Sequence, residues 1–383
     1  MKKRELLLAI TILILPGLLL ASAEIHVSKN GKDSNSGGKQ DPYLTISKAA
    51  SAVQPGDTVI VHGGTYREWV KPLRGGTGEE SRITYRAAKG EKVVIKGSEI
   101  IKGWKQVGGG VWKVELANSF FGDYNPYALI LTGDWLAYGK WHHRGDVYLN
   151  GKAFLEMQKE EEVGQTSGSW FCRTDEKTTT IVANFGKGDP NKETVEINVR
   201  GGLFMPEITG LKYITIDGFH FLHAASNWAA PNRFQPGAVG TWMGKCWVIQ
   251  NCTITDCRCV GIILGKAPGI DFSDIDAYGD HIIRNNIIRR CGQSGIAGYK
   301  GATRSLIEGN LIEDTNYRSE FGGQETAAIK FHYSVDTIIK NNLIRRVNEK
   351  KDNHGADGIG GFGIWIDANN QSFRVTGNIV YDT

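Results

Sequence analysis

The sequence predicts an all-β protein, a right-handed parallel β-helix with an inserted antiparallel β-sandwich. Three observations support this fold class. Short segments of one pattern recur through the C-terminal half, a second set of strand-like segments follows the same spacing, and an aromatic-rich stretch interrupts the repeat. Repetition at a period of 20–50 residues is typical of stacked supersecondary units.

The first recurring segment is an alternating β-branched run, then Asn or Gly, then a second alternating run, as in "HIIRNNIIRRC". Gly and Asn tolerate positive φ, so each copy reads as strand, tight bend, strand. We expect the Asn residues at the centre of the copies to form a side-chain ladder. The central positions, 24 to 36 residues apart, are Phe219, Cys252, Asn286, Asn310, Asn342 and Asn378.

The second set of strands runs in register with the first and places one Ile column in the core. Because side chains alternate along a strand, the opposite face carries other columns. These columns are Gly261, Gly295, Ala328 and Gly363; Ile263, Ala297, Lys330 and Trp365; and Gly265, Tyr299, His332 and Asp367.

Coils of a β-helix stack about 4.8 Å apart, so we expect Tyr299, His332 and Asp367 to be neighbours on the outside. The small-residue column would then form a groove floor beside a reactive wall that includes Lys330 and Trp365. A solvated strand face without function is the alternative interpretation.

The N-terminus has the pattern of a secretory signal peptide over residues 1–23. A basic start precedes an apolar run from Leu6 to Leu20 and the small residues at 21–23. We therefore expect a secreted or periplasmic protein that has no membrane contact after cleavage. Cleavage removes three basic residues and one acidic residue, so the net charge falls from +4 to about +2. This nearly neutral chain without a basic run does not favour a nucleic-acid partner.

The rest of the chain divides into three parts. Residues 24–97 have the short strands of opening coils, with a helical run from Thr45 to Val53 that would plug the open end. Residues 98–196 lose the repeat and alternate strands with turns, which indicates the β-sandwich. Residues 197–383 resume the coils. Most aromatic residues of the insert should be core, with Trp135 and Trp170 considered for sugar stacking, as is Trp228 where the coils resume.

Six cysteines in an exported protein permit disulfides. Cys257 and Cys291 occupy the same repeat position, and both a bridge and a pair of core thiols fit that spacing. The sequence contains no metal-binding spacing of Cys and His residues, so we expect no metal and no cofactor.

Several stretches resemble the glycoside hydrolase family 120 β-xylosidases across nearly all of the mature chain. They are "DPYLTISKAASAVQPGDTVIVHGGTYREWVKP", "RITYRAAKGEKVVIKGSE", "NSFFGDYNPY", "GDVYLNG", "HIIRNNIIRRCGQSGIAG" and "GIWID". The resemblance implies the same fold and a retaining hydrolysis of xylosides, with xylo-oligosaccharides or related plant-type glycans as substrates.

The resemblance also implies roles for residues. Asp367 in "GIWID" matches the family's nucleophile, Glu325 in "GGQE" matches a carboxylate of the −1 subsite, and Trp135 matches a substrate-contacting Trp. Lys330 and His332 on the adjacent coil would hold Asp367 ionised. Including these, the substrate-binding residues we expect are Trp135, Trp228, Gln293, Tyr299, Lys330, His332 and Trp365.

The family's acid/base Glu lies about one coil after the nucleophile, a position just past Thr383. We therefore expect the chain to be the N-terminal part of a longer solenoid, with weak hydrolysis of ordinary xylosides unless Glu325 substitutes as the acid. Two alternatives stay open. One is a non-catalytic carbohydrate-binding protein, and the other is a polysaccharide lyase, which typically needs a Ca²⁺ site of clustered carboxylates.

Overall fold

The computed structural model describes residues 22–133, 135–138, 140–228, 236–265, 273–320, 322–323, 325–348 and 360–383. The expected signal peptide, apart from its last two residues, lies outside the described residues. Within the described ranges, no helix is long and apolar enough to cross a membrane.

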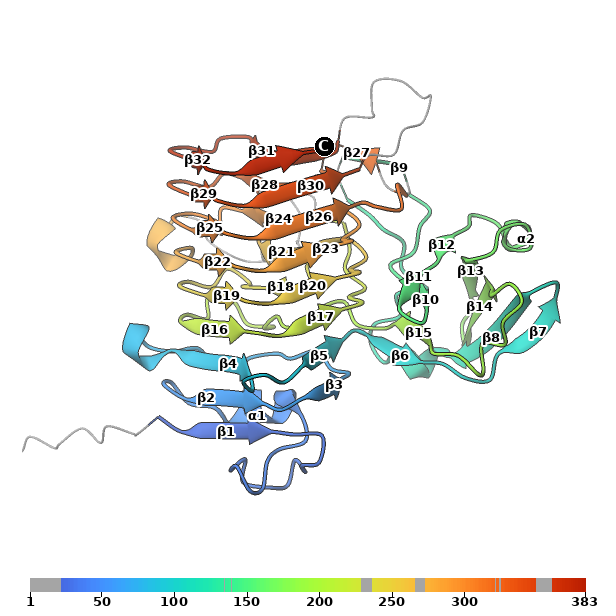
Figure 1. Cartoon of the computed structure of the whole chain (residues 1–383), viewed down its shortest axis with the longest axis horizontal. Coiled ribbons are helices and arrows are strands. Elements are labelled where there is room, and N and C mark those ends of the chain that lie inside the picture. The colour runs from blue at the N-terminus through green and yellow to red at the C-terminus, as the bar shows by residue number, and fades with distance from the viewer. Residues whose placement is uncertain are drawn as a thin grey trace, which may run out of the picture.

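Most of the chain is a stack of coils in which parallel strands form three sheets (Figure 1). The first sheet consists, in order, of β1 (Glu24–Val27), β2 (Thr58–Val61), β4 (Ile83–Ala87), β16 (Ile214–Asp217), β19 (Val248–Gln250), β22 (Ile282–Arg284), β25 (Leu306–Glu308), β29 (Ile338–Lys340) and β32 (Arg374–Thr376). The second consists of β3 (Gly64–Tyr66), β5 (Val93–Lys96), β17 (His220–Leu222), β20 (Thr253–Thr255), β23 (Ile287–Arg289), β26 (Leu311–Thr315), β30 (Leu343–Val347) and β33 (Ile379–Tyr381). The third consists of β18 (Val239–Gly240), β21 (Val260–Leu264), β24 (Ser294–Tyr299), β28 (Ala327–His332) and β31 (Phe362–Asp367).

The recurring segments form the first two sheets, as the repeat predicts. In each copy the two alternating runs are strands, and the Asn or Gly between them is the bend. Ile249, Ile283 and Ile307 lie one above another and are fully buried in the core of the stack. Burial of one such side chain contributes about 2 kcal/mol, so the repeat of Ile supplies much of the driving force for stacking.

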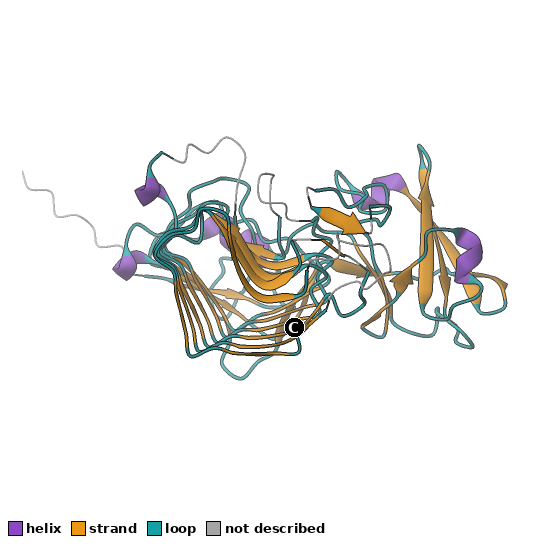
Figure 2. Cartoon of the chain, turned by 90° about the horizontal axis from the view of Figure 1, so that it is seen from above, coloured by secondary structure: helices purple, strands orange, loops and turns teal. Residues whose placement is uncertain are grey.

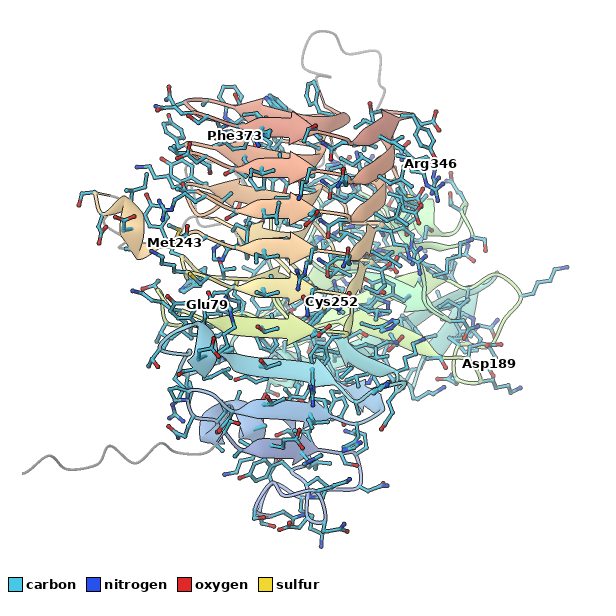
Figure 3. The ribbon with its side chains drawn as sticks, turned by 60° about the vertical axis from the view of Figure 1, so that its left-hand side comes forward. Glu79, Asp189, Met243, Cys252, Arg346 and Phe373 are labelled. Carbon is cyan, nitrogen blue, oxygen red and sulfur yellow. The ribbon has the colours of Figure 1, made fainter. Side chains whose placement is uncertain are left out.

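The Asn ladder is confirmed. The side-chain oxygen of Asn310 accepts hydrogen bonds from the backbone and side-chain amides of Asn286, both at 3.0 Å. Asn342 does the same for Asn310, and the backbone amide of Cys252 binds Asn286 at 3.0 Å. Figure 3 shows Cys252 in the middle of the stack and Phe373 on the upper coils. The ladder satisfies polar groups that each bend would otherwise bury without partners.

The opening coils carry α1 (Ile46–Ala52), in which the side chain of Thr45 caps the N-terminus. Ile46, Ala49 and Ala50 of this helix join the core cluster that contains the first coils. The expected helix is therefore present and covers apolar residues of this end. Short 3-10 helices lie at η1 (Glu79–Ser81), η2 (Asn118–Phe121) and η3 (Ile275–Ala277).

The aromatic-rich stretch forms two mainly antiparallel sheets beside the stack, the expected sandwich (Figure 2). One sheet consists of β11 (Lys152–Ala153), β10 (Val147–Leu149), β15 (Val195–Asn198) and β6 (Ser98–Ile100), and the other of β12 (Leu155–Glu156), β13 (Ser169–Thr174), β14 (Thr178–Asn184), β8 (Val111–Ala117) and β7 (Lys105–Gly108). The short helix α2 (Glu160–Val163) packs on β13. Trp104, Tyr127 and Trp170 are buried in the core of this domain, so Trp170 is a core residue and not a sugar platform.

The six cysteines are all described, and all are free thiols. Cys257 and Cys291 lie in contact within the core, and a hydrogen bond between their two thiols, together with burial, raises the pKa of Cys257 well above its usual value. Of the two interpretations that the spacing left open, the structure shows the pair of core thiols.

Candidate active site

The third sheet positions the expected wall of polar residues. In the register between β28 and β31, Lys330 pairs with Trp365 and His332 pairs with Asp367. One coil below, Tyr299 pairs with His332. The predicted vertical column of Tyr299, His332 and Asp367 is therefore present in the structure.

The small-residue column has a different place from the one the sequence predicts. A Cβ atom on Gly261 would meet the Sγ atom of Cys291 at 3.1 Å, and one on Gly363 would meet Val380 at 2.4 Å. Ala328 belongs to the buried core cluster. These residues face the inside of the coil, where they leave room for the side chains of the second sheet. The expected groove floor is therefore wrong, because these positions face the core side of the coil.

Lys330 is the centre of the polar cluster. Its Nζ atom lies 3.0 Å from Oε1 of Glu325 and 3.4 Å from Oδ2 of Asp367, and it lies 3.3 Å from the centroid of the Trp365 ring. Burial lowers the pKa of Lys330, and the two carboxylates oppose that change.

His332 lies between the same two carboxylates. Its Nε2 atom is 3.5 Å from Oε2 of Glu325, and its Nδ1 atom is 3.7 Å from Oδ2 of Asp367. Both nitrogens are buried, and neither makes a hydrogen bond with the residues that the structure describes. One atom of each of these three residues lies within 4.8 Å of the others, a set that also suits a divalent cation. Lys330 already supplies positive charge between the carboxylates, so we assign no metal to the cluster.

Asp367 and Glu325 differ in how solvent reaches them. The side chain of Asp367 is 34% exposed, whereas that of Glu325 is 3% exposed. Oδ1 of Asp367 accepts a hydrogen bond from the amide of Ala368 at 2.8 Å, which fixes its orientation. An oxygen of each carboxylate lies within 4.8 Å of the other. The exposed carboxylate is the one that an incoming substrate meets.

The inserted domain supplies a second side of the site. Its strand β9 (Leu136–Tyr138) pairs with β27 (Gly322–Gly323), and Leu136 lies opposite Gly323. Trp135 directly precedes β9, has a positive φ of 63° and is 58% exposed. Glu325 follows β27 by two residues, so this pairing brings the exposed indole and the buried carboxylate into one region.

Two expected substrate-binding residues have other roles. Trp228 is wholly buried, and it packs with Val260 and Ile263 beneath the surface of the third sheet. A sugar cannot reach this ring, so the expectation for Trp228 is wrong. Gln293 is also buried, and its Nε2 atom donates to the carbonyl of Glu325 at 3.4 Å. Gln293 therefore contacts the backbone of Glu325 from the buried side of the site.

Tyr299 and Trp365 border the polar cluster. Tyr299 is half-buried, and its ring centroid lies 5.0 Å from that of Tyr333. Trp365 is also half-buried and contacts Phe362 edge to face, with ring centroids 4.2 Å apart. Their aromatic surface lies beside His332 and Lys330 at the register positions the sequence predicts.

The sequence did not predict a cluster of buried charges at the junction of the two domains. Arg258 is fully buried and forms ion pairs with Glu156 of the insert, at 2.6 Å, and with Glu320, at 3.1 Å. The "CRC" sequence at 257–259 contained one signal, because an Arg between two core positions needs buried acidic partners. The partners themselves lie about 60 and 100 residues away, and periodicity does not identify them.

Comparison with known proteins agrees with this architecture. The glycoside hydrolase 120 insertion domain matches residues 101–169 and 161–197, and the right-handed β-helix region matches residues 232–383. A protein of unknown function, DUF1565, matches residues 29–73. The structure of XylC in complex with xylose is 40% identical and has a TM-score of 0.86, covering 94% of this chain and 62% of that chain.

Two other relatives extend the comparison. The uncharacterized protein YwoF of Bacillus subtilis (strain 168) is 37% identical over 76 residues, which are 20% of this chain and 16% of YwoF. The lacto-N-biosidase of family GH136 from Eubacterium ramulus has a TM-score of 0.51 at 14% identity, covering 94% of this chain and 56% of that chain. This last likeness shows the fold alone.

The protein is thus a right-handed parallel β-helix protein with an inserted β-sandwich, as its sequence predicts. The match to the glycoside hydrolase 120 insertion domain and the 40% identity to XylC over nearly the whole chain make it similar to glycoside hydrolase family 120. The chain spans 62% of the length of XylC.

Proposed function

We propose that this protein is a retaining glycoside hydrolase that acts on xylosides, with Asp367 as the nucleophile. The observation that carries the proposal is the pair of carboxylates around Lys330, one exposed and one buried, with oxygens within 4.8 Å of each other. The likeness to XylC, whose structure contains xylose, supports xylose as the sugar.

In the reaction, an oxygen of Asp367 attacks the anomeric carbon of the xyloside, and the bond from that carbon to the leaving group breaks. The electron pair of this bond departs with the leaving oxygen, and a covalent glycosyl ester remains. The oxygen of a water molecule then attacks the anomeric carbon and the bond to Asp367 breaks, which restores the carboxylate and releases xylose; the proton lost by the water passes to solvent, from which the leaving oxygen takes one. Lys330 and His332 both contact Oδ2 of Asp367 and orient the carboxylate for the attack.

Glu325 has a different role in this proposal. It pairs with the ammonium of Lys330 and accepts a hydrogen bond from a hydroxyl of the sugar. Trp135 supplies an exposed aromatic face for the apolar side of the sugar.

The test uses an aryl xyloside with a good leaving group, because such a leaving group needs little protonation. Wild-type protein should release the aryl alcohol, and Asp367→Ala should reduce the rate by on the order of 10³-fold or more. Added azide should react with the sugar in Asp367→Ala and yield xylosyl azide of inverted configuration. Equal rates in wild type and Asp367→Ala contradict the proposed nucleophile.

A non-catalytic carbohydrate-binding protein is the second candidate, favoured by the exposed Trp135 beside the site. Calorimetry with xylo-oligosaccharides separates the two proposals. Heat of binding without release of xylose supports the binding protein, whereas binding followed by release of xylose supports the hydrolase.

We also propose that the protein is exported, on the basis of the signal-peptide pattern in residues 1–23. Expression of the full chain followed by cell fractionation tests this. A mature N-terminus near Glu24 outside the cytoplasm is the expected result, and an uncleaved chain in the cytoplasm contradicts it.

A further inference from the structure

Buried charges gather where the inserted domain meets the β-helix. Each member is largely or fully buried, and the members come from both domains. This junction cluster consists of Asp146, Glu156, Arg258, Arg318 and Glu320. Burying charges is costly unless each is paired and hydrogen-bonded, so the geometry of the pairs matters.

Arg258 makes the first set of contacts. In addition to its ion pairs with Glu156 and Glu320, its Nε atom donates to the carbonyl of His143 at 2.9 Å. Glu156 also binds the ring nitrogens of His142 at 3.1 Å and His143 at 2.6 Å. Burial alone would raise the pKa of Glu156, but the hydrogen bonds from the two histidines and the charge of Arg258 lower it to about 2.

Arg318 makes the second set of contacts. Its two terminal nitrogens each lie 2.8 Å from an oxygen of Asp146, and one also donates to the carbonyl of Phe154 at 2.8 Å. Its Nε atom lies 2.9 Å from Oε2 of Glu320. Oε2 of Glu320 therefore contacts two guanidinium groups. One belongs to Arg258 of the β-helix, and the other belongs to Arg318 of the same segment as Glu320.

The segment that carries Glu320 leads directly into the candidate active site. Gly322 and Gly323 pair with β9 of the insert, next to Trp135, and Glu325 follows. Fixing residue 320 against Arg258 fixes the start of this short connection. Networks of buried charges restrict geometry more reliably than they add stability.

We infer that Glu320 is a positioning residue that sets the place of Glu325 and of Trp135 relative to Asp367. This inference rests on the proposed function, because it assigns a purpose to the geometry of that same site. Glu320 touches no substrate and acts through the segment between Arg318 and Glu325.

The chain offers a matched control at the other end of the same junction. Glu196 is 1% exposed and lies 2.7 Å from Arg67 and 2.8 Å from Lys96, and it accepts a hydrogen bond from Ser98 at 3.2 Å. This carboxylate also joins the insert to the β-helix through buried charge pairs. Arg67, Lys96 and Ser98 all lie outside the segment that leads to Glu325.

The experiment compares Glu320→Gln with Glu196→Gln in the full-length protein. Both substitutions keep side-chain size and remove a buried charge. For Glu320→Gln we expect faster hydrogen exchange in residues 316–327, and a fall in kcat/KM for the aryl xyloside of on the order of 10-fold to 100-fold. For Glu196→Gln we expect lower stability, with exchange of 316–327 and kcat/KM close to wild type.

The inference is overturned if the two variants have the same exchange in 316–327 and the same kcat/KM. Should Glu320→Gln not fold, Arg318→Lys replaces it, because Lys keeps the charge but loses the two parallel bonds to Asp146. The same pattern of exchange is then expected, and unchanged exchange overturns the inference. If the wild-type protein neither hydrolyses the aryl xyloside nor binds xylose, the proposed function is contradicted instead. The comparison of hydrogen exchange still tests whether Glu320 positions the segment.

Discussion

Lys330 and Glu325 form an ion pair of 3.0 Å in which both side chains are almost completely buried. Removal of one partner from such a pair leaves an uncompensated buried charge. Asp367 is bound by the same ammonium but keeps a third of its side chain exposed. One cation thus contacts both a buried and an exposed carboxylate, which in the proposed reaction bind the sugar and attack it, respectively.

Activity should decline at alkaline pH as Lys330 loses its proton. Burial lowers the pKa of Lys330 below its usual value of 10.5, so the decline should begin below that pH. Lys330→Arg, which stays charged, should move the decline in kcat/KM to higher pH. An unchanged alkaline limb in Lys330→Arg contradicts this role.

The lowered pKa of Lys330 also affects stability, and here rising pH is favourable, whereas it is unfavourable for activity. Between the folded-state pKa of Lys330 and 10.5, the unfolded chain binds a proton that the folded protein has lost. The contribution of this group to the free energy of unfolding therefore rises with pH in that window. Urea unfolding of wild type and Lys330→Met across this pH range measures the difference.

Trp135→Ala should weaken binding of xylobiose by roughly tenfold, the equivalent of about 1–1.5 kcal/mol from one aromatic contact. Because this indole is exposed, the thermal midpoint should change little. Trp228→Ala is the comparison, since loss of a buried Trp costs about 3–5 kcal/mol. Calorimetry and thermal unfolding measure both variants, and equal affinity in Trp135→Ala and wild type removes Trp135 from the site.

Asn310→Ala should lower the free energy of unfolding by about 2–3 kcal/mol. The substitution removes the acceptor for two amides of Asn286 and the donor to the carbonyl of Ile283. Asn378→Ala, at a half-buried rung of the same ladder, should cost less than half as much. Equal costs in urea unfolding contradict a ladder whose value depends on burial.

His281 should contribute to acid unfolding. Its Nδ1 atom accepts a hydrogen bond from the backbone amide of Trp247 at 3.1 Å, and burial lowers its pKa to about 3. Below pH 6.5, His281 therefore binds a proton in the unfolded chain but not in the folded protein. Stability from this group is present above pH 6.5 and is lost as pH falls toward 3, by at most about 5 kcal/mol.

His281→Gln keeps an acceptor for Trp247 without the titration, so its free energy of unfolding should depend less on pH between 6.5 and 3. Part of the dependence should remain, because His223 is also buried and has a pKa lowered to about 4 by burial. Identical pH dependence in wild type and His281→Gln rules out this contribution.

The β-helix could be predicted from the sequence because each coil repeats the same residue pattern. The bend at Asn286 and the buried Ile283 recur one coil later at Asn310 and Ile307, so period and pattern agree. The register of the third sheet followed in the same way, and it placed His332 beside Asp367.

Local pattern failed where distant segments meet. Trp228 is an aromatic residue of the kind that can stack on a sugar. In the structure it is buried in a cluster with residues of the third sheet. The charge pairs of Arg258 join segments far apart in sequence, and alternation of residues says nothing about them. The inward turn of Gly261 likewise depends on backbone geometry at the start of its strand.

The pairing of β9 with β27 also sets an order of assembly. During synthesis from the N-terminus, β9 emerges well before the coil that carries Gly322 and Gly323, so its edge waits without a partner. Lower coils and the sandwich can form first, whereas the sugar-facing wall closes only when that later coil arrives. A ribosome that stalls in between would release a chain with much of its architecture complete and its recognition surface still open.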